Sequence, residues 1–401
     1  MHHTISGGRV LLPQGWSHDV SVQVDGEIIE AIGSTRTDGH LWDATGLLVL
    51  PGIIDVHGDA FERQIMPRPS VHFSMDTALR DTDRQLVANG VTTAFHAVTW
   101  SWEPGLRGHA MARAFSESLG RLRPSLSADQ RLHLRWETFN LDAEAEISTW
   151  IEAGKIDFLA FNDHTPPMMA RSDQPKYVQR YAERTGLDSA GFLALLRSVW
   201  ERRSEVPAAI GRLAAKAKAH GIAMASHDDD SPQTRASFRA MGCQIAEFPL
   251  TMDTFEAAHQ AQDPIIMGAP NVVRGGSHLS GVSASEMVGK RFCTILASDY
   301  YYPALAQAAF RLAKENVVPF AEAWALISAN PARATGLADR GVLAPGKRAD
   351  FVLVDTEAGT PRIVATFVAG KPVFLDRDAF SRLRSSHSGS MSRETNTLAT
   401  A

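Results

Sequence analysis

Histidine and carboxylate side chains close several short apolar segments of this chain, and their types suit metal chemistry. His57 and Asp59 follow the apolar run GIIDV at a spacing of two, which puts both side chains on one face of a strand. The same residue types recur after later apolar segments, at Glu137, His164, His227 and Asp299. Imidazole and carboxylate groups that converge on one point are the ligands a divalent transition metal needs. The pattern predicts a metal site, provided that the fold brings these segment ends together.

Each of these residues also has an ordinary structural explanation. A single histidine at a strand end is more often a hydrogen-bonded structural residue than a ligand, and Glu137 or Asp299 alone could cap a helix or lie on the surface. However, histidines and carboxylates recur at the ends of successive segments, and this recurrence favours a role as metal ligands over the structural explanation. His96, which closes another apolar segment, is either a further member of the site or a group that supports it.

The segments that must position these residues alternate with helical segments between residues 51 and 339. Helices are expected around 75–90, 207–221, 231–242 and 317–330, with Ser231 and Ser283 as N-caps. Strands are expected at 48–59, 92–100, 131–140, 155–164, 222–230, 243–250, 264–273 and 294–303. This alternation predicts an α/β protein with a (β/α)8 barrel, in which the carboxyl ends of the strands meet at one mouth. An open doubly wound sheet is the alternative, although no G-x-G-x-x-G follows the first strand.

Both ends of the chain differ from the middle. Residues 1–50 and 340–378 contain short apolar strands separated by turn signals such as Asp25-Gly26. We expect these two segments to form one small β domain beside a barrel domain at 51–339. Residues 382–401 are rich in Ser and Thr and poor in apolar side chains, so we expect a disordered tail there.

The composition excludes several classes of protein. The chain has 401 residues, of which 44% are hydrophobic, enough to bury a large core. Its 40 Lys and Arg against 45 Asp and Glu give a net charge of −5, so a nucleic-acid partner is not expected. No apolar stretch reaches the roughly 20 residues of a membrane helix, and no secretory signal is visible, so we expect a cytoplasmic protein without a membrane partner. Cys243 and Cys293 lie in apolar runs and are expected as buried thiols in a reducing compartment.

Longer motifs are more specific than the single residues. They are HGDAFERQIMPRPSV (57–71), NDHTPP (162–167), SHDDD (226–230), IAEFPLT (245–251), MGAPNVVRGGSH (267–278) and SDYYYP (298–303). With these motifs the sequence resembles the amidohydrolase superfamily, and more closely its members of the phosphonate pathway. The resemblance covers nearly the whole chain up to about residue 378. The run at 330–355 is shared more widely across the superfamily.

The resemblance implies a distorted barrel with a β-sandwich built from both chain ends. It also implies one or two divalent metal ions in the barrel mouth, with zinc as the first choice and manganese or iron as alternatives, and a metal-activated water as the nucleophile. By position, the implied ligands are His57, Asp59, His164, His227 and Asp299. Asp299 would also accept the proton of the attacking water.

Many relatives bridge two metals with a carboxylated lysine, and this chain departs from that arrangement. None of its lysines closes a predicted strand at the carboxyl end, since Lys155 precedes its strand. Glu137 is therefore our candidate for the bridge, because a carboxylate supplies the same two oxygens.

The same resemblance implies hydrolysis of the triphosphate of alpha-D-ribose 1-methylphosphonate 5-triphosphate, with release of diphosphate. Phosphoanhydride chemistry needs cations around the non-bridging oxygens. The candidates near the mouth are Arg63, Arg68, Arg135, Arg274 and His278. Prolines stiffen the loop around Arg68, and Arg274 precedes Gly275-Gly276, a pair that can turn successive N–H groups toward an anion.

Two other functions remain open on the sequence alone. One is hydrolysis of a C–N bond in a small cyclic or acyl amide by the same metals. The other is a non-catalytic barrel retained as a subunit of an assembly, against which the intact set of candidate ligands argues. We expect a small anionic molecule as the partner, and a homo-oligomer is compatible with each function. Gln64, Pro167 and Met168 depart from the pattern of the phosphonate-pathway members, which bears on the substrate rather than on the metal.

Overall fold

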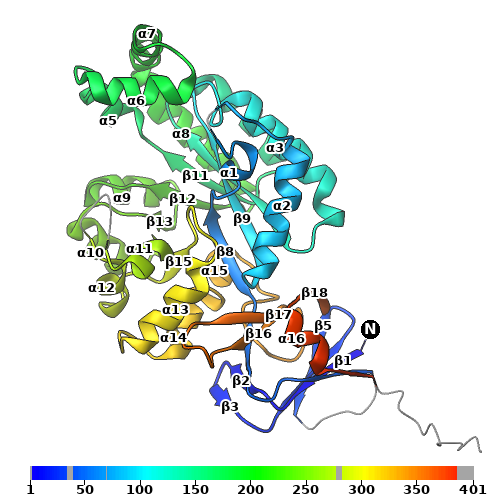
Figure 1. Cartoon of the computed structure of the whole chain (residues 1–401). Coiled ribbons are helices and arrows are strands. Elements are labelled where there is room, and N and C mark those ends of the chain that lie inside the picture. Colours follow the sequence, from blue (N-terminus) through cyan, green and yellow to red (C-terminus); the bar gives the residue numbers. More distant parts are fainter. Residues whose placement is uncertain (1, 34–38, 69, 277–281, 386–401) are drawn as a thin grey trace, which may run out of the picture.

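The predicted barrel is present in the computed structural model, which describes residues 2–33, 39–68, 70–276 and 282–385 (Figure 1). Its strands lie side by side in chain order, and neighbours are parallel. They are β8 (Ile53–Gly58), β9 (Val91–Trp100), β10 (Asp129–Glu137), β11 (Phe158–Asn162), β12 (Ala223–His227), β13 (Ile245–Glu247), β14 (Ile265–Gly268) and β15 (Ile295–Ala297). Each barrel strand expected from the sequence is confirmed, and the doubly wound alternative is excluded.

The ring of strands closes between β8 and β15 at the mouth. One parallel bridge joins Gly58 to Asp299. The N–H of Asp299 donates to the carbonyl of His57, and the N–H of Asp59 donates to the carbonyl of Asp299, both at 2.9 Å. Deeper in the barrel, segment 326–327 lies between the two strands and accepts a backbone hydrogen bond from each. The seam is therefore held directly by residues of the mouth.

Both faces of the barrel strands are buried, which explains their nearly continuous apolar sequences. Inside the barrel, Ile54, Phe95, Phe158 and Ile266 belong to one buried apolar cluster. On the outside, Leu134 and other strand side chains pack against helices.

The helices α2 (Met75–Ala88), α3 (His109–Leu122), α4 (Glu144–Glu152), α8 (Val206–Ala219), α9 (Pro232–Ala240), α10 (Met252–Gln260) and α13 (Ala304–Lys314) surround the barrel (Figure 1). Shorter helices are α1 (Glu62–Ile65), α11 (Ala269–Arg274), α12 (Ala284–Gly289), α14 (Phe320–Ala325) and α15 (Ala329–Ala334). Ser231 and Ser283 cap α9 and α12 as predicted, since each hydroxyl accepts a backbone N–H three residues later. Within the described part of the chain, no helix is long and apolar enough to cross a bilayer.

Most barrel strands are shorter than expected, and two of them end at least five residues early. The segment predicted as a strand at 264–273 ends at Gly268 and continues as α11, because Pro270 lies in the first turn, where proline favours helix formation. The strand predicted at 294–303 ends at Ala297. Both strands stop where the chain turns across the mouth.

Between β11 and β12 the chain leaves the barrel and forms α5 (Thr165–Ala170), α6 (Pro175–Thr185) and α7 (Ser189–Glu201), here called the helical lobe. The lobe lies at the top of Figure 1, with α6 on the side nearer the barrel. Val178 and Ala182 of α6 pack with Phe192 and Leu196 of α7 in a small apolar core. This core leaves the other face of α6 available to the cleft below it.

The two chain ends form two further sheets that pack on each other. One sheet contains, in spatial order, β19 (Leu383–Ser385), β6 (His40–Asp43), β1 (His2–Ser6), β4 (Ser21–Asp25) and β5 (Ile28–Gly33). The other contains β18 (Lys371–Leu375), β17 (Arg362–Val368), β16 (Phe351–Asp355), β7 (Leu48–Pro51), β2 (Arg9–Leu12) and β3 (Gly15–Ser17). Because β7 pairs with β16, the two ends share one sheet. Val22 and Ile5 of the first sheet and Val49 and Phe367 of the second share one core.

The end of the chain is more ordered than its composition suggests. Helix α16 (Arg377–Arg382) precedes β19, which pairs with β6. Residues 383–385 of the expected tail therefore form a strand, and 386–401 lie outside the described residues.

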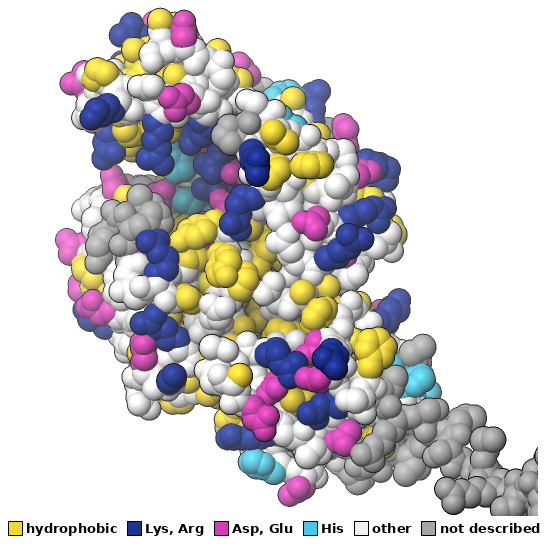
Figure 2. Space-filling model, in the orientation of Figure 1, with side chains coloured by type: hydrophobic (Ala, Val, Ile, Leu, Met, Phe, Trp, Pro, Cys, Tyr) yellow, Lys and Arg dark blue, Asp and Glu magenta, His cyan; other side chains and the backbone are white. Residues whose placement is uncertain are grey.

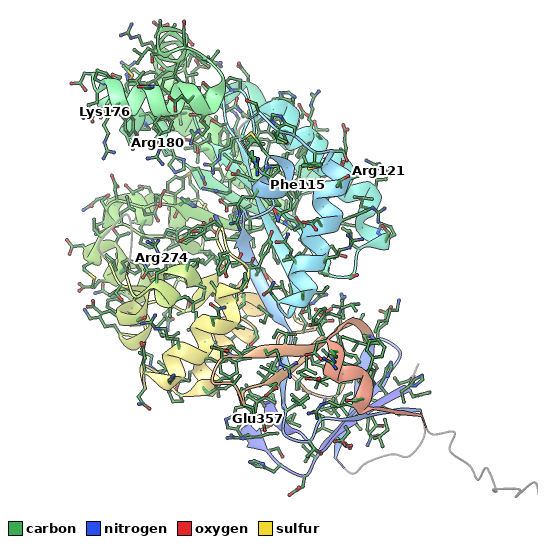
Figure 3. The ribbon with its side chains drawn as sticks, in the orientation of Figure 1. Phe115, Arg121, Lys176, Arg180, Arg274 and Glu357 are labelled. Atoms are coloured by element: carbon green, nitrogen blue, oxygen red, sulfur yellow. The ribbon has the colours of Figure 1, made fainter. Side chains whose placement is uncertain are left out.

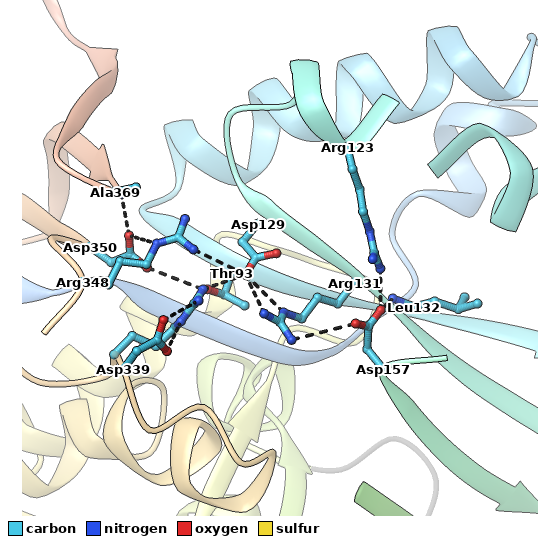
Figure 4. Close-up of polar contacts among 11 residues, drawn as sticks. Thr93, Arg123, Asp129, Arg131, Leu132, Asp157, Asp339, Arg348, Asp350 and Ala369 are labelled. Carbon is cyan, nitrogen blue, oxygen red and sulfur yellow. Dashed lines mark hydrogen bonds and ion pairs between the residues drawn. The ribbon is translucent and has the colours of Figure 1, made fainter. Parts of the chain in front are cut away.

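A network of ion pairs lies at the end of the barrel opposite the mouth (Figure 4). Asp129, the first residue of β10, accepts hydrogen bonds from Arg131 at 2.9 Å and from Arg340 at 2.7 Å. Arg340 is only 5% exposed and lies 3.8 Å from the buried carboxylate of Asp350. Because Arg340 and Asp350 precede β16, the network fastens the sandwich to the barrel.

Candidate metal-dependent active site

A cavity of about 280 Å³ opens at the carboxyl ends of the barrel strands. Figure 2 shows the hollow, with histidine visible inside it and Lys and Arg side chains on its upper wall. The sequence-predicted ligands that line the cavity are His57, Asp59, His164, His227 and Asp299. Arg107, Arg135 and Asp228 also line it. The fold thus brings together residues that are far apart in the sequence.

Sharp backbone turns over the mouth help to gather these residues. Asp228 (φ 59°) and Phe248 (φ 52°) directly follow β12 and β13, and Asp299 (φ 53°) lies two residues after β15; all three have left-handed backbone conformations. Such conformations are uncommon for residues other than glycine and concentrate at functional sites. In Asp228 and Asp299 they return a carboxylate to the cavity wall.

His164, His227 and Asp228 form the outer donor group. Their candidate ligand atoms all lie within 4.8 Å of one another. Asp228 Oδ2 lies 3.1 Å from Nε2 of His164 and 3.0 Å from Nδ1 of His227. One carboxylate oxygen and two imidazole nitrogens therefore face a common point, which is the arrangement of a partial tetrahedral zinc site.

The protonation states of His164 and Asp228 in the outer donor group depend on their charged neighbours. The negative charge of Glu137 raises the pKa of His164 to about 10, against the effect of burial and with help from Asp228. Burial alone would raise the pKa of Asp228, but His227 and His164 outweigh it and hold that pKa well below its ordinary value. Without a metal, the group therefore holds a proton on His164 that a metal must displace.

His57, His133 and Glu247 form the inner donor group, and all three are buried. Glu247 Oε1 lies 3.0 Å from His57 Nδ1, and Glu247 Oε2 lies 3.6 Å from His133 Nε2. Burial lowers the pKa of His133 to about 3 and that of His57 well below its ordinary value, so both rings are neutral. Of this group only His57 is among the described residues that line the cavity, so Glu247 supports its ring from beneath.

The donor groups fit a divalent cation. Nδ1 of His227, Nε2 of His133 and Oε2 of Glu247 are buried and form no hydrogen bond of adequate geometry among the described residues, although each lies within 3.6 Å of another donor atom of its own group. Buried polar atoms without a partner are costly, and each of these atoms is of a type that ligates zinc, manganese or iron. Together with Asp59 and Asp299, which also line the cavity, the two groups can accommodate one or two ions.

Asp59 and Asp299 lie close to each other on the cavity wall, both partly buried. Burial raises the pKa of Asp59 to about 7, and Glu62 and Asp299 add to the effect. Burial likewise raises the pKa of Asp299 to about 6, with Arg135 opposing it. Two crowded carboxyls with raised pKa values are typical of catalytic sites, and a cation between them would restore their charge.

Glu137 lies behind His164 rather than on the mouth cavity. Its Oε1 lies 2.5 Å from His164 Nδ1, and its Oε2 accepts the backbone N–H of His164 at 3.3 Å. It lines a smaller neighbouring cavity of about 140 Å³ together with Arg107 and Arg184. This geometry orients the His164 ring, and the metal bridge that we expected at Glu137 stays a prediction.

Two guanidinium groups line the cavity, that of the buried Arg135 and that of the partly buried Arg107. Nη2 of Arg135 donates to Nε2 of His227 at 3.3 Å, and its Nη1 lies 3.9 Å from Asp59. Arg107 pairs with Glu62 at 3.3 Å and lines both the mouth cavity and the smaller one. These cations are the nearest anion-binding groups to the candidate metal donors.

The other predicted cations lie farther out. Arg63 donates to the carbonyl of Tyr300 at 2.5 Å, and Arg274 donates to the Tyr300 hydroxyl at 3.4 Å. Tyr300 lines the cavity, so both arginines contact its rim. Arg68 is exposed and is not among the described lining residues, and His278 lies outside the described residues.

Sequence reasoning missed Arg107, His133, Asp228 and Glu247 as parts of the site. His133 lies at even spacing before Arg135 in the same strand, so period-two alternation could have found it. His96 is buried against Phe61 and Phe115 and hydrogen-bonds Gln130 at 2.8 Å, away from both donor groups.

A family model, curated sequences and solved structures all show similarity of this chain to amidohydrolases. Residues 297–374 match the model of the amidohydrolase family. The chain is 33% identical over 345 residues to the alpha-D-ribose 1-methylphosphonate 5-triphosphate diphosphatase of Escherichia coli (strain K12), covering 83% of this chain and 89% of that protein. It is 24% identical over 367 residues to an adenine deaminase of Methylobacterium nodulans, covering 88% of this chain and 55% of that protein. An amidohydrolase structure from a Sargasso Sea environmental sample superposes with a TM-score of 0.64 at 14% identity, covering 94% and 93% of the two chains.

The structural likeness shows a common barrel-and-sandwich fold. The identity to the Escherichia coli enzyme extends over most of both chains and shows a closer relationship, that of a hydrolase. The chain belongs to the amidohydrolase superfamily, in the family of the alpha-D-ribose 1-methylphosphonate 5-triphosphate diphosphatases.

Proposed function

We propose that this protein hydrolyses the triphosphate of alpha-D-ribose 1-methylphosphonate 5-triphosphate and releases diphosphate. Water adds to the phosphorus nearest the sugar, the bond to the next bridging oxygen breaks, and diphosphate leaves, so that a 5-phosphate remains on the ribose. The relative from Escherichia coli supports this substrate.

One observation carries the proposal. The cavity combines metal donor groups with two guanidinium groups, the buried Arg135 and the partly buried Arg107. An uncharged amide needs the first but presents only one developing negative charge, on its carbonyl oxygen, to the second. A phosphoanhydride needs both, because charge spreads over its non-bridging oxygens as the bond breaks.

His164, His227 and Asp228 would hold one divalent ion, and His57, Asp59 and Asp299 would hold a second. A bound ion supplies the Lewis acidity that makes water nucleophilic near neutral pH. Zinc suits the mixed nitrogen and oxygen donors, with manganese or iron as alternatives.

The proton of the attacking water goes to Asp299. This carboxyl lines the cavity beside the other candidate ligands, so it can take that proton and pass it on. Arg135 and Arg107 bind the non-bridging oxygens of the reacting phosphate through charge-assisted hydrogen bonds. The apolar rim at 248–250 limits water access on one side.

The test is diphosphate release by the metal-loaded enzyme in ¹⁸O-labelled water, followed by ³¹P NMR. We expect the label in the 5-phosphate product and none in the diphosphate. Arg107→Met should lower kcat/KM about ten- to a hundredfold without changing the metal content, since arginine is no ligand. Arg113→Met, which removes an exposed cation that pairs with Glu146, is the matched control and should leave kcat/KM unchanged.

Hydrolysis of a C–N bond is the second candidate, supported by the adenine deaminase relative. If no sugar or nucleoside triphosphate yields diphosphate while a cyclic amide or aminopurine is cleaved, this second function replaces the first.

We also propose a cytoplasmic enzyme, supported by the two buried free cysteines, Cys243 and Cys293. The homo-oligomer stays a prediction, which light scattering of the purified protein tests.

A further inference from the structure

Helix α6 of the helical lobe carries a row of cations along one face. Lys176, Arg180 and Arg184 are spaced four residues apart, which places them one above another on the helix. The opposite face, with Val178 and Ala182, is buried against α7. The row therefore points away from the core of the lobe.

The row faces the cleft that leads to the mouth cavity. Figure 3 shows Lys176 and Arg180 extending from α6 into the gap, with Arg274 on its other side. Figure 2 shows Lys and Arg side chains on the wall of the same hollow. Positive side chains thus line the approach to the candidate metal site from both sides.

The inner end of the row is anchored beside the site. Arg184 lines the smaller cavity together with Arg107, Glu137 and His164, and it forms an ion pair with the buried Glu103. Because a helix rises about 1.5 Å per residue, the row runs outward from there for about 12 Å. It begins at the candidate ligand His164 and ends at the open edge of the cleft.

The two outer cations are not neutralised by the protein. Lys176 and Arg180 are exposed and have no ion pair within the part of the chain described here, whereas Arg184 is paired. Glu183, the acidic residue of α6, is hydrogen-bonded to Gln179 at 2.9 Å. Like charges one turn apart disfavour a helix slightly, so an anion between them would stabilise α6 as well as bind.

We propose that Lys176 and Arg180 bind the terminal phosphate groups of a polyphosphate chain whose reacting phosphorus lies beside Arg107 and Arg135. This inference rests on the proposed triphosphate substrate and adds where the leaving diphosphate is held. The helical lobe is thereby a polyphosphate-binding element, and the sugar end of the substrate lies on the other side of the metal donors.

The first experiment measures binding without turnover. Inorganic tripolyphosphate and diphosphate are titrated into the metal-loaded protein by calorimetry. We expect Lys176→Met/Arg180→Met to weaken both ligands at least tenfold, with unchanged metal content and an unchanged thermal unfolding midpoint. The matched control, Arg197→Met/Lys314→Met, removes the same charge from exposed positions outside the row and should bind as the wild type does.

The second experiment separates this inference from the proposed function. With the triphosphate substrate, the double variant should show a raised KM and a smaller change in kcat, and weaker inhibition by added diphosphate. If the wild type hydrolyses no triphosphate yet binds tripolyphosphate through these two residues, the binding element stands and the proposed reaction fails. Unchanged affinity in the double variant, an equal loss in the control, or no binding of tripolyphosphate by the wild type overturns the inference.

Discussion

Replacing Glu247 by glutamine tests whether the inner donor group supports a metal ligand. Glu247 Oε1 lies 3.0 Å from Nδ1 of His57, and both residues are buried. A ligating histidine commonly donates its other ring N–H to a carboxylate, which fixes the ring and makes it a stronger ligand. In Glu247→Gln the amide oxygen can still accept this hydrogen bond, so geometry is kept and only the charge is lost.

The expected size of the effect follows from that difference. Hydrogen bonds to charged groups contribute about 1.5–3 kcal/mol and neutral ones about 0.5–1.5 kcal/mol. Losing the charge thus costs about 1.4 kcal/mol, or about tenfold in metal affinity. Because burial holds the pKa of His57 well below its ordinary value, its ring is neutral at pH 7, with one N–H for Glu247 and one nitrogen free to ligate, and competition from a second proton does not mask the loss.

Metal affinity is measured by competition with a chelator at pH 7, and the metal content by mass spectrometry. Glu103→Gln is the matched control, since it removes a buried carboxylate that pairs with Arg184 outside both donor groups. An unchanged affinity in Glu247→Gln would refute the supporting role. Loss of a whole equivalent of metal at saturation would also refute it and would make Glu247 a ligand itself.

Four further outcomes are expected. His227→Ala should lose bound metal and hydrolysis while its circular dichroism stays that of the wild type. Arg274→Met should raise KM or lower kcat about ten- to a hundredfold at constant metal content, and wild-type kinetics would make this residue structural. Because the pKa of His164 is raised from 6.5 to about 10 in the metal-free chain, metal must displace a proton, so affinity measured by chelator competition should increase from pH 6.5 to 8.5. Arg340→Met should lower the free energy of unfolding by about 1–3 kcal/mol in urea titrations, since the buried Asp350 loses this partner but keeps Arg348 at 3.0 Å.

The sequence could predict the barrel because its signals are local. Each strand is a short apolar run, and caps such as Ser231 depend on residues only three positions away. The rule that strand ends converge at one mouth then gathered His57, His164 and His227 without any knowledge of contacts. The strand expected to extend to residue 273 was too long, because the helix signal of Pro270 was read as part of an apolar run.

The rest of the site depends on contacts between distant segments. Glu247 lies in a strand of three residues, and only its approach to His57, 190 positions earlier, gives it a role. Arg107 follows β9 in a loop whose course back to the mouth has no pattern in the sequence. Lys176 and Arg180 read as ordinary surface charges until the helical lobe is seen beside the cavity.

The junction between β8 and β15 couples local opening of the barrel to binding of a ligand in the cavity. The backbone hydrogen bonds that join β8 to β15 at the mouth are made by His57, Asp59 and Asp299, whose side chains line the cavity. Any local unfolding that separates these strands must also separate the same side chains. A ligand bound between the side chains therefore stabilises the closed barrel. The amide protons of Asp59 and Asp299 should then exchange with solvent more slowly as the cavity fills, because a bound ligand adds its binding free energy to the opening. The exchange rates of these two amides therefore report how far the cavity is occupied, without any need for turnover of a substrate.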